Sequence, residues 1–244
     1  MQTSLDLAAL WGQGDSIAHI TLILLLVMSV ITWYLIISKS LANWRMSRHA
    51  RAFLRHFWDA PSLAEVGEYL HVKGMNDPFS RLTRHGFKAA GQYRNKSGQR
   101  LIASGSEDEF LTRALRRAIS QETARLEHGQ TMLASIASSA PFVGLFGTVW
   151  GIYHALAKIG MSGSASLEQV AGPVGEALIM TAFGLAVAIP AALAYNFFNR
   201  AKRSVLAELD GFAHDLFAFM STGVRGHAHL SVVEGEPARA TESA

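Results

Sequence analysis

Three polar side chains stand in two otherwise apolar stretches of the chain, and their types are the ones most able to do chemistry. Glu176 supplies a carboxylate, and Thr148 and Thr181 supply hydroxyls. An ionisable group inside a membrane segment is costly and by default marks a functional site. We expect Glu176 to exchange protons along a water-filled or protein-lined path, with the two threonines beside it.

Each of these residues has a simpler interpretation. Glu176 could be a carboxylate near the start of a helix, close to lipid headgroups. A threonine in a membrane helix often bonds only its own backbone. The depth of the residues favours the functional interpretation. Thr148 lies eight residues before Leu156, and Glu176 lies nine residues after Leu167. At about 1.5 Å per residue, both lie roughly 12–14 Å inside the same end of two antiparallel helices, and Thr181 lies about 7 Å deeper.

One further group is needed for such a path. The apolar stretches hold no other carboxylate and no Lys or Arg. A proton path needs a second titratable or hydrated site. Either several copies of the chain surround a shared lumen, or a partner helix supplies the missing group.

The composition places these stretches in a membrane. Of 244 residues, 50% are hydrophobic and only 17% are charged. The apolar residues gather in three runs, each near the roughly 20 residues that a membrane-spanning helix needs. The expected fold is an all-α integral membrane protein, with three transmembrane helices and long cytoplasmic helical extensions. The expected segments are an N-terminal periplasmic segment (1–16), transmembrane helix 1 (17–38), a cytoplasmic helical domain (39–129), transmembrane helix 2 (130–157), a periplasmic loop (158–166), transmembrane helix 3 (167–199), a cytoplasmic helix (200–223) and a disordered tail (224–244).

The basic residues predict the orientation. Sixteen of the 22 Lys and Arg residues lie between the first and second apolar runs, and five follow the third. The positive-inside rule therefore places the N-terminus outside and the C-terminus in the cytoplasm. This charge is better explained by topology than by nucleic-acid binding. The basic cytoplasmic helices either bind anionic membrane lipids or form a solvated face.

Local signals place helices in the cytoplasmic part. Pro61 can open one, and Asp77 followed by Pro78 is a cap before a proline at the first helical position. Ser106 with Glu109 matches a capping box. We see no residue that stops this last helix, so we expect it to run without a break from about Glu107 into the membrane.

Small residues and prolines shape the membrane helices. Small positions let such helices approach closely, and proline kinks them. The candidates for helix packing are Gly144, Gly147, Gly172, Gly175 and Gly184, with kinks at Pro141 and Pro190.

Enzymatic chemistry has no support in the sequence. The chain has no cysteine, and its ten histidines form no metal-ligand pattern. The segment GLFGTVWG lacks the lysine of a P-loop. Ser135, Ser138 and Ser139 lack a G-x-S-x-G context. We expect neither catalytic residues nor a cofactor or metal.

The segments SAPFVGLFGTVWGIYHAL and VAGPVGEALIMTAFGLAVAIPAALAYN closely resemble the signature helices of the ExbB/TolQ/MotA family of proton-channel motor subunits. Three crossings resemble the ExbB and TolQ branches rather than MotA, which has four. The segments ITWYLIISKS and FAHDL favour the ExbB branch, whereas Phe57-Trp58 is similar to TolQ.

The resemblance implies a homopentamer of long helices around an apolar pore, which holds the single membrane helices of two ExbD copies. An aspartate of ExbD would supply the missing titratable group opposite Glu176. Thr148 and Thr181 match the polar pore residues of the family. The complex would use the proton gradient of the inner membrane to drive TonB, which energises uptake of iron-siderophore complexes and vitamin B12.

Two other functions remain open. The first is a TolQ-like role, in which TolR and TolA drive constriction of the envelope. The second belongs to another class, a passive membrane scaffold whose long helices only hold a partner. A scaffold should tolerate Glu176→Gln, whereas a proton path should not.

Overall fold

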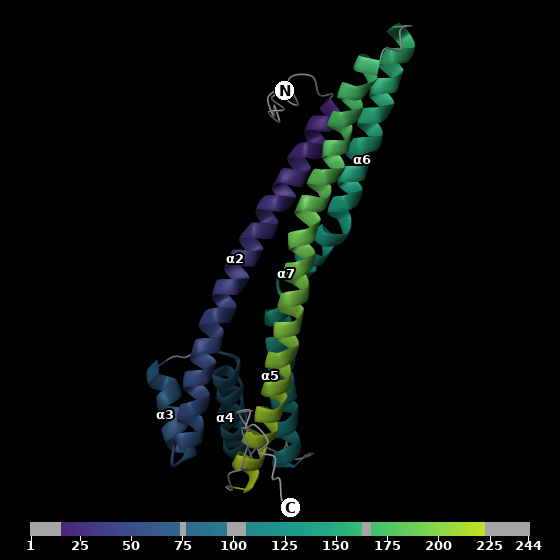
Figure 1. Ribbon diagram of the computed structural model, residues 1–244. Helices are drawn as coiled ribbons and strands as arrows, with labels where there is room; N and C mark the ends of the chain where they lie inside the picture. The colour runs from purple at the N-terminus through teal and green to yellow at the C-terminus, as the bar shows by residue number, and fades with distance from the viewer. Residues whose placement is uncertain (1–15, 74–76, 97–105, 163–166, 223–244) are drawn as a thin grey trace, which may run out of the picture.

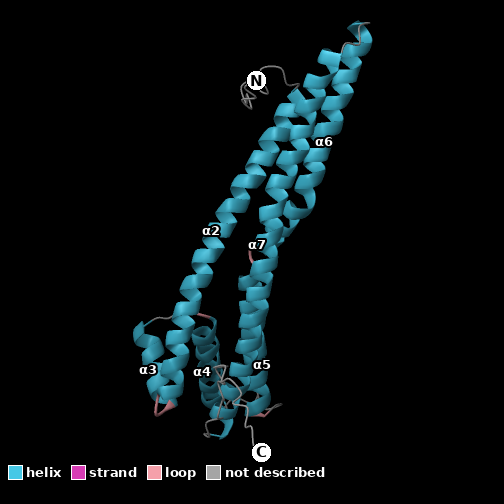
Figure 2. Cartoon of the chain, viewed as in Figure 1, coloured by secondary structure: helices cyan, strands magenta, loops and turns pink. Residues whose placement is uncertain are grey.

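The computed structural model describes residues 16–73, 77–96, 106–162 and 167–222. Within these ranges the chain forms six helices and no strand (Figures 1 and 2). The helices are α2 (Ser16–Asp59), α3 (Leu63–Lys73), α4 (Pro78–Lys96), α5 (Glu107–Glu127), α6 (Gln130–Ser162) and α7 (Leu167–Thr222). The predicted tail after Thr222 and the segment before Ser16 lie outside the described residues.

The molecule is elongated, with three helices at one end and a cluster of helices at the other (Figure 1). The N-terminal part of α2, the whole of α6 and the N-terminal part of α7 run side by side. Three stretches are long and apolar enough to cross a membrane: Ser16–Asp59, Glu107–Met161 and Ala177–Ser221. The predicted all-helical chain with three membrane-spanning helices is therefore confirmed.

Two apolar cores hold the helices together. In the membrane part, α2, α6 and α7 bury a cluster that includes Leu25, Leu133 and Ala191. In the other part, α2, α3, α4, α5 and the C-terminal half of α7 surround a second, aromatic cluster. The Phe212 ring of α7 lies 4.9 Å from that of Phe57 and 5.5 Å from that of Phe79. The helices α2 and α7 belong to both cores and so connect the two parts.

The predicted helix starts are present. Asp77 Oδ1 accepts hydrogen bonds from the backbone N–H groups of Phe79 and Ser80, each at 3.0 Å, and Pro78 opens α4. Ser106 Oγ accepts from the N–H of Glu109 at 3.2 Å. Each cap satisfies donors that the first turn of a helix would otherwise leave unpaired.

The expectation of one unbroken helix from Glu107 into the membrane is wrong. The helix is interrupted at His128 and Gly129, where α5 ends and α6 begins. Gly129 has φ 76°, in the left-handed region that glycine adopts without a steric penalty. A Cβ there would lie 3.2 Å from Leu35 Cδ2, so the break packs directly against α2.

Polar contacts hold this joint between α5 and α6. Lys39 Nζ donates to the Leu126 carbonyl at 3.0 Å, and Gln130 Nε2 donates to the Phe198 carbonyl at 3.3 Å. Lys202 pairs with Glu127 at 3.1 Å. Burial, together with the nearby charge of Lys202, lowers the pKa of the Lys39 ammonium. The joint thus ties α2 and α7 to the point where the helices of the second core meet the membrane helices.

A buried ion pair joins α4 to α5. Arg81 Nε donates to Glu122 Oε1 at 2.7 Å, and Arg81 Nη2 lies 2.5 Å from Oε2. Arg125 adds a third contact at 2.9 Å. The Glu122 side chain is only 3% exposed. A carboxylate this deeply buried depends on its partners, because removing one side of a buried pair leaves an uncompensated charge.

The variant Glu122→Gln should therefore destabilise the helices around the aromatic core by about 3 kcal/mol, since it leaves Arg81 without its bidentate partner. Thermal unfolding of the detergent-solubilised protein, followed by circular dichroism, measures this loss. Glu109→Gln is the matched control, because Glu109 pairs with Arg113 on an exposed face of α5. It should cost about 0.5 kcal/mol or less. Equal losses in the two variants would contradict this account of the buried pair.

Candidate functional site

The helices α6 and α7 touch through their backbones. A Cβ on Gly144 would lie 2.7 Å from the Met180 carbonyl oxygen and 2.9 Å from Gly184 Cα. A Cβ on Gly184 would lie 2.8 Å from the Ala140 carbonyl oxygen. No real side chain tolerates such distances to backbone atoms, so only glycine fits at either position. This contact brings the two helices close enough for side chains one turn away to bond across them.

Thr148 of α6 forms hydrogen bonds across this contact to α7. Its Oγ1 lies 2.5 Å from Thr181 Oγ1, 3.0 Å from the Ala177 carbonyl oxygen and 3.2 Å from the Gly144 carbonyl oxygen. The residue is buried, with 7% of its surface exposed. Thr148 thus bonds its own helix, as the simpler interpretation expects, and α7 as well.

The number of protons in this cluster limits its bonding. Each hydroxyl donates one hydrogen bond and accepts up to two. When Thr148 donates to the Ala177 carbonyl, Thr181 must donate to Thr148. When Thr148 instead donates to Thr181, the carbonyl loses that bond. The proton of Thr148 thus has three acceptors within reach, the Ala177 and Gly144 carbonyls and Thr181 Oγ1, and exchange among them is the property required of a relay.

Glu176 is the residue before Ala177 on α7. Its side chain lies outside the part of the chain that the structure describes. The expected levels are wrong by about one helical turn. Thr148 bonds Thr181, which was expected about 7 Å deeper, and it is Gly151 whose Cβ would lie against Ala177, 2.9 Å from its Cβ. Glu176 therefore lies nearer the start of α7 than the level of Thr148. The role of all three residues in a proton path stays a prediction.

The other glycines expected in packing differ from one another. At Gly147 a Cβ would lie 3.0 Å from Thr21 Cγ2 of α2 and 3.2 Å from Met180 Cβ, so all three membrane helices meet there. At Gly172 and Gly175 a Cβ would meet nothing within 4 Å. Their role in helix packing therefore stays a prediction that concerns contacts outside the single chain. Pro141 and Pro190 lie inside α6 and α7, as expected.

The sequence alone did not single out two members of this region. Thr21 is buried against Gly147, and its hydroxyl donates to the Ile17 carbonyl at 2.9 Å. The Ala177 carbonyl is a backbone group, which no motif reveals. Thr21 could have been noticed as a hydroxyl in the first apolar run, but its helix partner could not.

Among the residues that the structure describes, no group of three or more His, Cys, Asp or Glu side chains is placed to hold a metal ion. The chemistry that this arrangement can support is therefore hydrogen bonding and proton transfer along hydroxyls, in a helix pair that excludes larger side chains.

Comparison with known proteins agrees with this chemistry. Residues 75–210 match the model of the MotA/TolQ/ExbB proton channel family. The chain belongs to this family. The resemblance found in the sequence is thus confirmed, and a proton-channel subunit rather than an enzyme is the class that the family defines.

Relatives in this family carry two kinds of name. The biopolymer transport protein ExbB of Xanthomonas campestris is 45% identical over 87% of this chain and 85% of its own length. The ExbB of Neisseria meningitidis is 41% identical over 87% of this chain and 96% of its own. The Tol-Pal system protein TolQ of Pseudomonas aeruginosa is 32% identical over 88% of this chain and 94% of its own.

The variant Gly184→Ala tests the glycine contact between α6 and α7. Its methyl group would meet the Ala140 carbonyl and Gly144, so the helices must separate, at a cost of about 1–3 kcal/mol. The measurement is the thermal midpoint of the purified protein in detergent. Gly175→Ala is the control, because the same methyl group meets nothing there. A midpoint for Gly184→Ala equal to that of Gly175→Ala would contradict the contact.

Proposed function

We propose that the chain is an ExbB-type subunit of an inner-membrane proton channel, which works with ExbD to turn the proton motive force into TonB-dependent transport across the outer membrane. Its cargo would be iron-siderophore complexes and vitamin B12. The observation that carries the proposal is the hydroxyl pair of Thr148 and Thr181, bonded to the backbone next to Glu176. A proton-carrying group and a two-residue relay would then lie within about one helical turn of each other in the membrane.

The proposed assembly supplies a second titratable group, which the apolar stretches of this chain lack. A proton path needs a second titratable group, and the apolar stretches supply only Glu176. We propose a homopentamer whose pore holds two ExbD helices, with an acidic side chain of ExbD as that group. In this arrangement the N-terminus is periplasmic and the C-terminus cytoplasmic, and the basic residues near the joint face the anionic lipids of the inner leaflet.

A TolQ-like role is supported less well. The named TolQ relative is 32% identical to this chain, whereas the ExbB relatives are 41–45% identical. The passive scaffold is opposed by the family, which is one of proton channels. The ExbB-like and TolQ-like roles differ in the process that fails when the subunit is lost. Iron uptake fails in the first case, and envelope constriction fails in the second.

The variant Glu176→Gln should abolish TonB-dependent iron uptake, because the amide has nearly the same shape as the carboxyl group but does not take up or release a proton as a carboxyl group does. The assay is uptake in cells that lack their own subunit and carry this chain or its variant, with membrane levels matched by immunoblot. Glu168→Gln, at the start of the same helix, is the control and should retain uptake. Full uptake with Glu176→Gln would remove Glu176 from the path. A failure of the unaltered chain would instead favour the TolQ-like role.

The variant Thr148→Val should lower uptake by at least about tenfold, since it removes the hydroxyl that joins Thr181 to the Ala177 carbonyl. Thr148→Ser keeps the hydroxyl and should retain most of the uptake. Proton flux into proteoliposomes that contain the assembled complex gives a second readout. If Thr148→Val retains the uptake and flux of the unaltered chain, the hydroxyl is not required at this position.

A further inference from the structure

An open groove of about 450 Å³ lies between α4 and α5, away from the site described above. Its lining residues include four basic side chains and no carboxylate: His85 and Lys88 of α4, and Arg113 and Arg117 of α5. Of these, Arg113 pairs with Glu109 on its own helix. The floor is formed by small apolar residues, with Ala118 and Ala89 buried. Such a groove can admit a helix closely, and its charge favours an acidic one.

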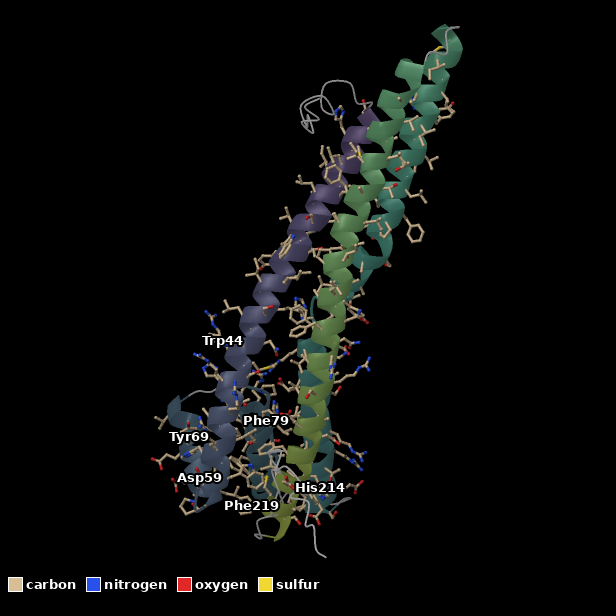
Figure 3. All side chains as sticks on the ribbon, viewed as in Figure 1. Trp44, Asp59, Tyr69, Phe79, His214 and Phe219 are labelled. Atoms are coloured by element: carbon tan, nitrogen blue, oxygen red, sulfur yellow. The ribbon has the colours of Figure 1, made fainter. Side chains whose placement is uncertain are left out.

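The cytoplasmic half of α7 carries the complementary charge. Its buried side packs into the aromatic core through Leu209, Phe212 and Leu216. Glu208, which is exposed, and Asp215, which is half-buried, lie about 20° apart on one edge of this buried side, and the exposed Asp210 lies on the other edge. Among the described residues, none of these three carboxylates has an ion-pair partner in the chain. In Figure 3 the charged side chains gather on this lower part of the molecule, where His214 marks α7.

The heights of the two surfaces match. Lys202 of α7 is bonded to Glu127 of α5. Farther down, a Cβ on Gly86 would touch both Leu216 of α7, at 3.4 Å, and Leu115 of α5, at 3.5 Å. The two helices are thus antiparallel and level, with Leu216 opposite Leu115. The carboxylates of α7, from Asp215 up to Glu208, therefore lie at the height of the α5 cations and just above them.

Every copy of the chain crosses the same bilayer with the same helices, so copies in one membrane lie at equal heights. Rotation about the membrane normal keeps each residue at its own height. The acidic side of α7 in one copy then meets the basic groove of the next at the right level. A head-to-tail contact of this kind closes into a ring when the rotation allows it.

We propose that the α4–α5 groove of each copy receives the acidic side of the cytoplasmic half of α7 from the neighbouring copy. This contact would extend the assembly proposed above from the membrane into the cytoplasm, and it rests on that assembly. Opposite charges fix the register between the copies, because like charges at this interface would cost several kcal/mol. The open space around Gly211, where a Cβ would meet nothing within 4 Å, leaves room for the approach.

Cross-linking of the full chain in native membranes tests the contact. The chain has no cysteine, so introduced thiols are the only ones present in it. The double variant Gly211→Cys with Gln121→Cys places one thiol on α7 and one in the groove, at nearly the same height. A short bis-maleimide should join neighbouring copies into a ladder of dimers and higher species. Gly211→Cys with Ser120→Cys is the matched control, because the adjacent residue on α5 points about 100° away and should give little product.

Charge exchange tests the cause of the contact. In the cross-linking background, Arg117→Glu should reduce the ladder by about tenfold, and adding Asp215→Arg should restore most of it. Arg116→Glu makes the same change of charge on the neighbouring exposed residue of α5 and should leave the ladder unchanged. A ladder that is insensitive to Arg117→Glu, or equally strong with Ser120→Cys, would overturn the proposal.

The oligomer mass separates this inference from the proposed function. Light scattering of the detergent extract gives the mass without any cross-link. A multimeric mass with no ladder would refute the contact and leave the assembly intact. A product that stops at the dimer would show a two-fold contact instead of a head-to-tail one and would also refute it. A monomeric mass would refute both the contact and the proposed assembly.

Discussion

The contact between Gly144 and Gly184 is the constraint on which the rest of the membrane part depends. It brings the backbones of α6 and α7 together, which places Thr148 within 3.0 Å of a carbonyl on the other helix. A larger residue at either glycine would force α6 and α7 apart, which would lengthen the bond between the Thr148 hydroxyl and the Ala177 carbonyl. In lipid no hydrophobic force drives helices together, so close packing and bonds of this kind must do so. The same contact therefore stabilises the pair and builds the site.

The joint at Gly129 connects the membrane helices to the helices of the second, aromatic core. Because α5 and α6 are separate helices, their relative direction is set by the side chains around the break and not by a continuous rod. Lys39 of α2 and Lys202 of α7 both bond to the end of α5, and Gln130 at the start of α6 bonds to α7. The helices α2 and α7, by contrast, run unbroken through both apolar cores. Two continuous helices thus connect the two parts beside one jointed pair.

Much of this could be predicted from local sequence. Apolar length predicted the three membrane helices, and Asp77-Pro78 and Ser106 predicted two helix starts, because each signal acts within a few residues. Counting from the ends of the apolar runs placed Thr148 level with Glu176, whereas the packed helices place it about one helical turn deeper, level with Thr181. The break at Gly129 was missed, since a single glycine within a helical pattern is often tolerated. The pairs Arg81–Glu122 and Thr148–Thr181 join residues far apart in the chain, so only the packed structure reveals that they bond.

The hydroxyl pair also explains why one chain is not a complete channel. Two hydroxyls can pass a proton only by exchanging donor and acceptor, and each exchange must end with the pair returned to its first arrangement. That return requires a group on either side which gives and takes protons, whereas a backbone carbonyl such as that of Ala177 only accepts a hydrogen bond. Glu176 can serve on one side, and the apolar stretches hold no second such group. The chemistry of the site therefore supports the proposed membrane partner, and in the proposed assembly the complementary charges of the long helices would hold several copies around that partner.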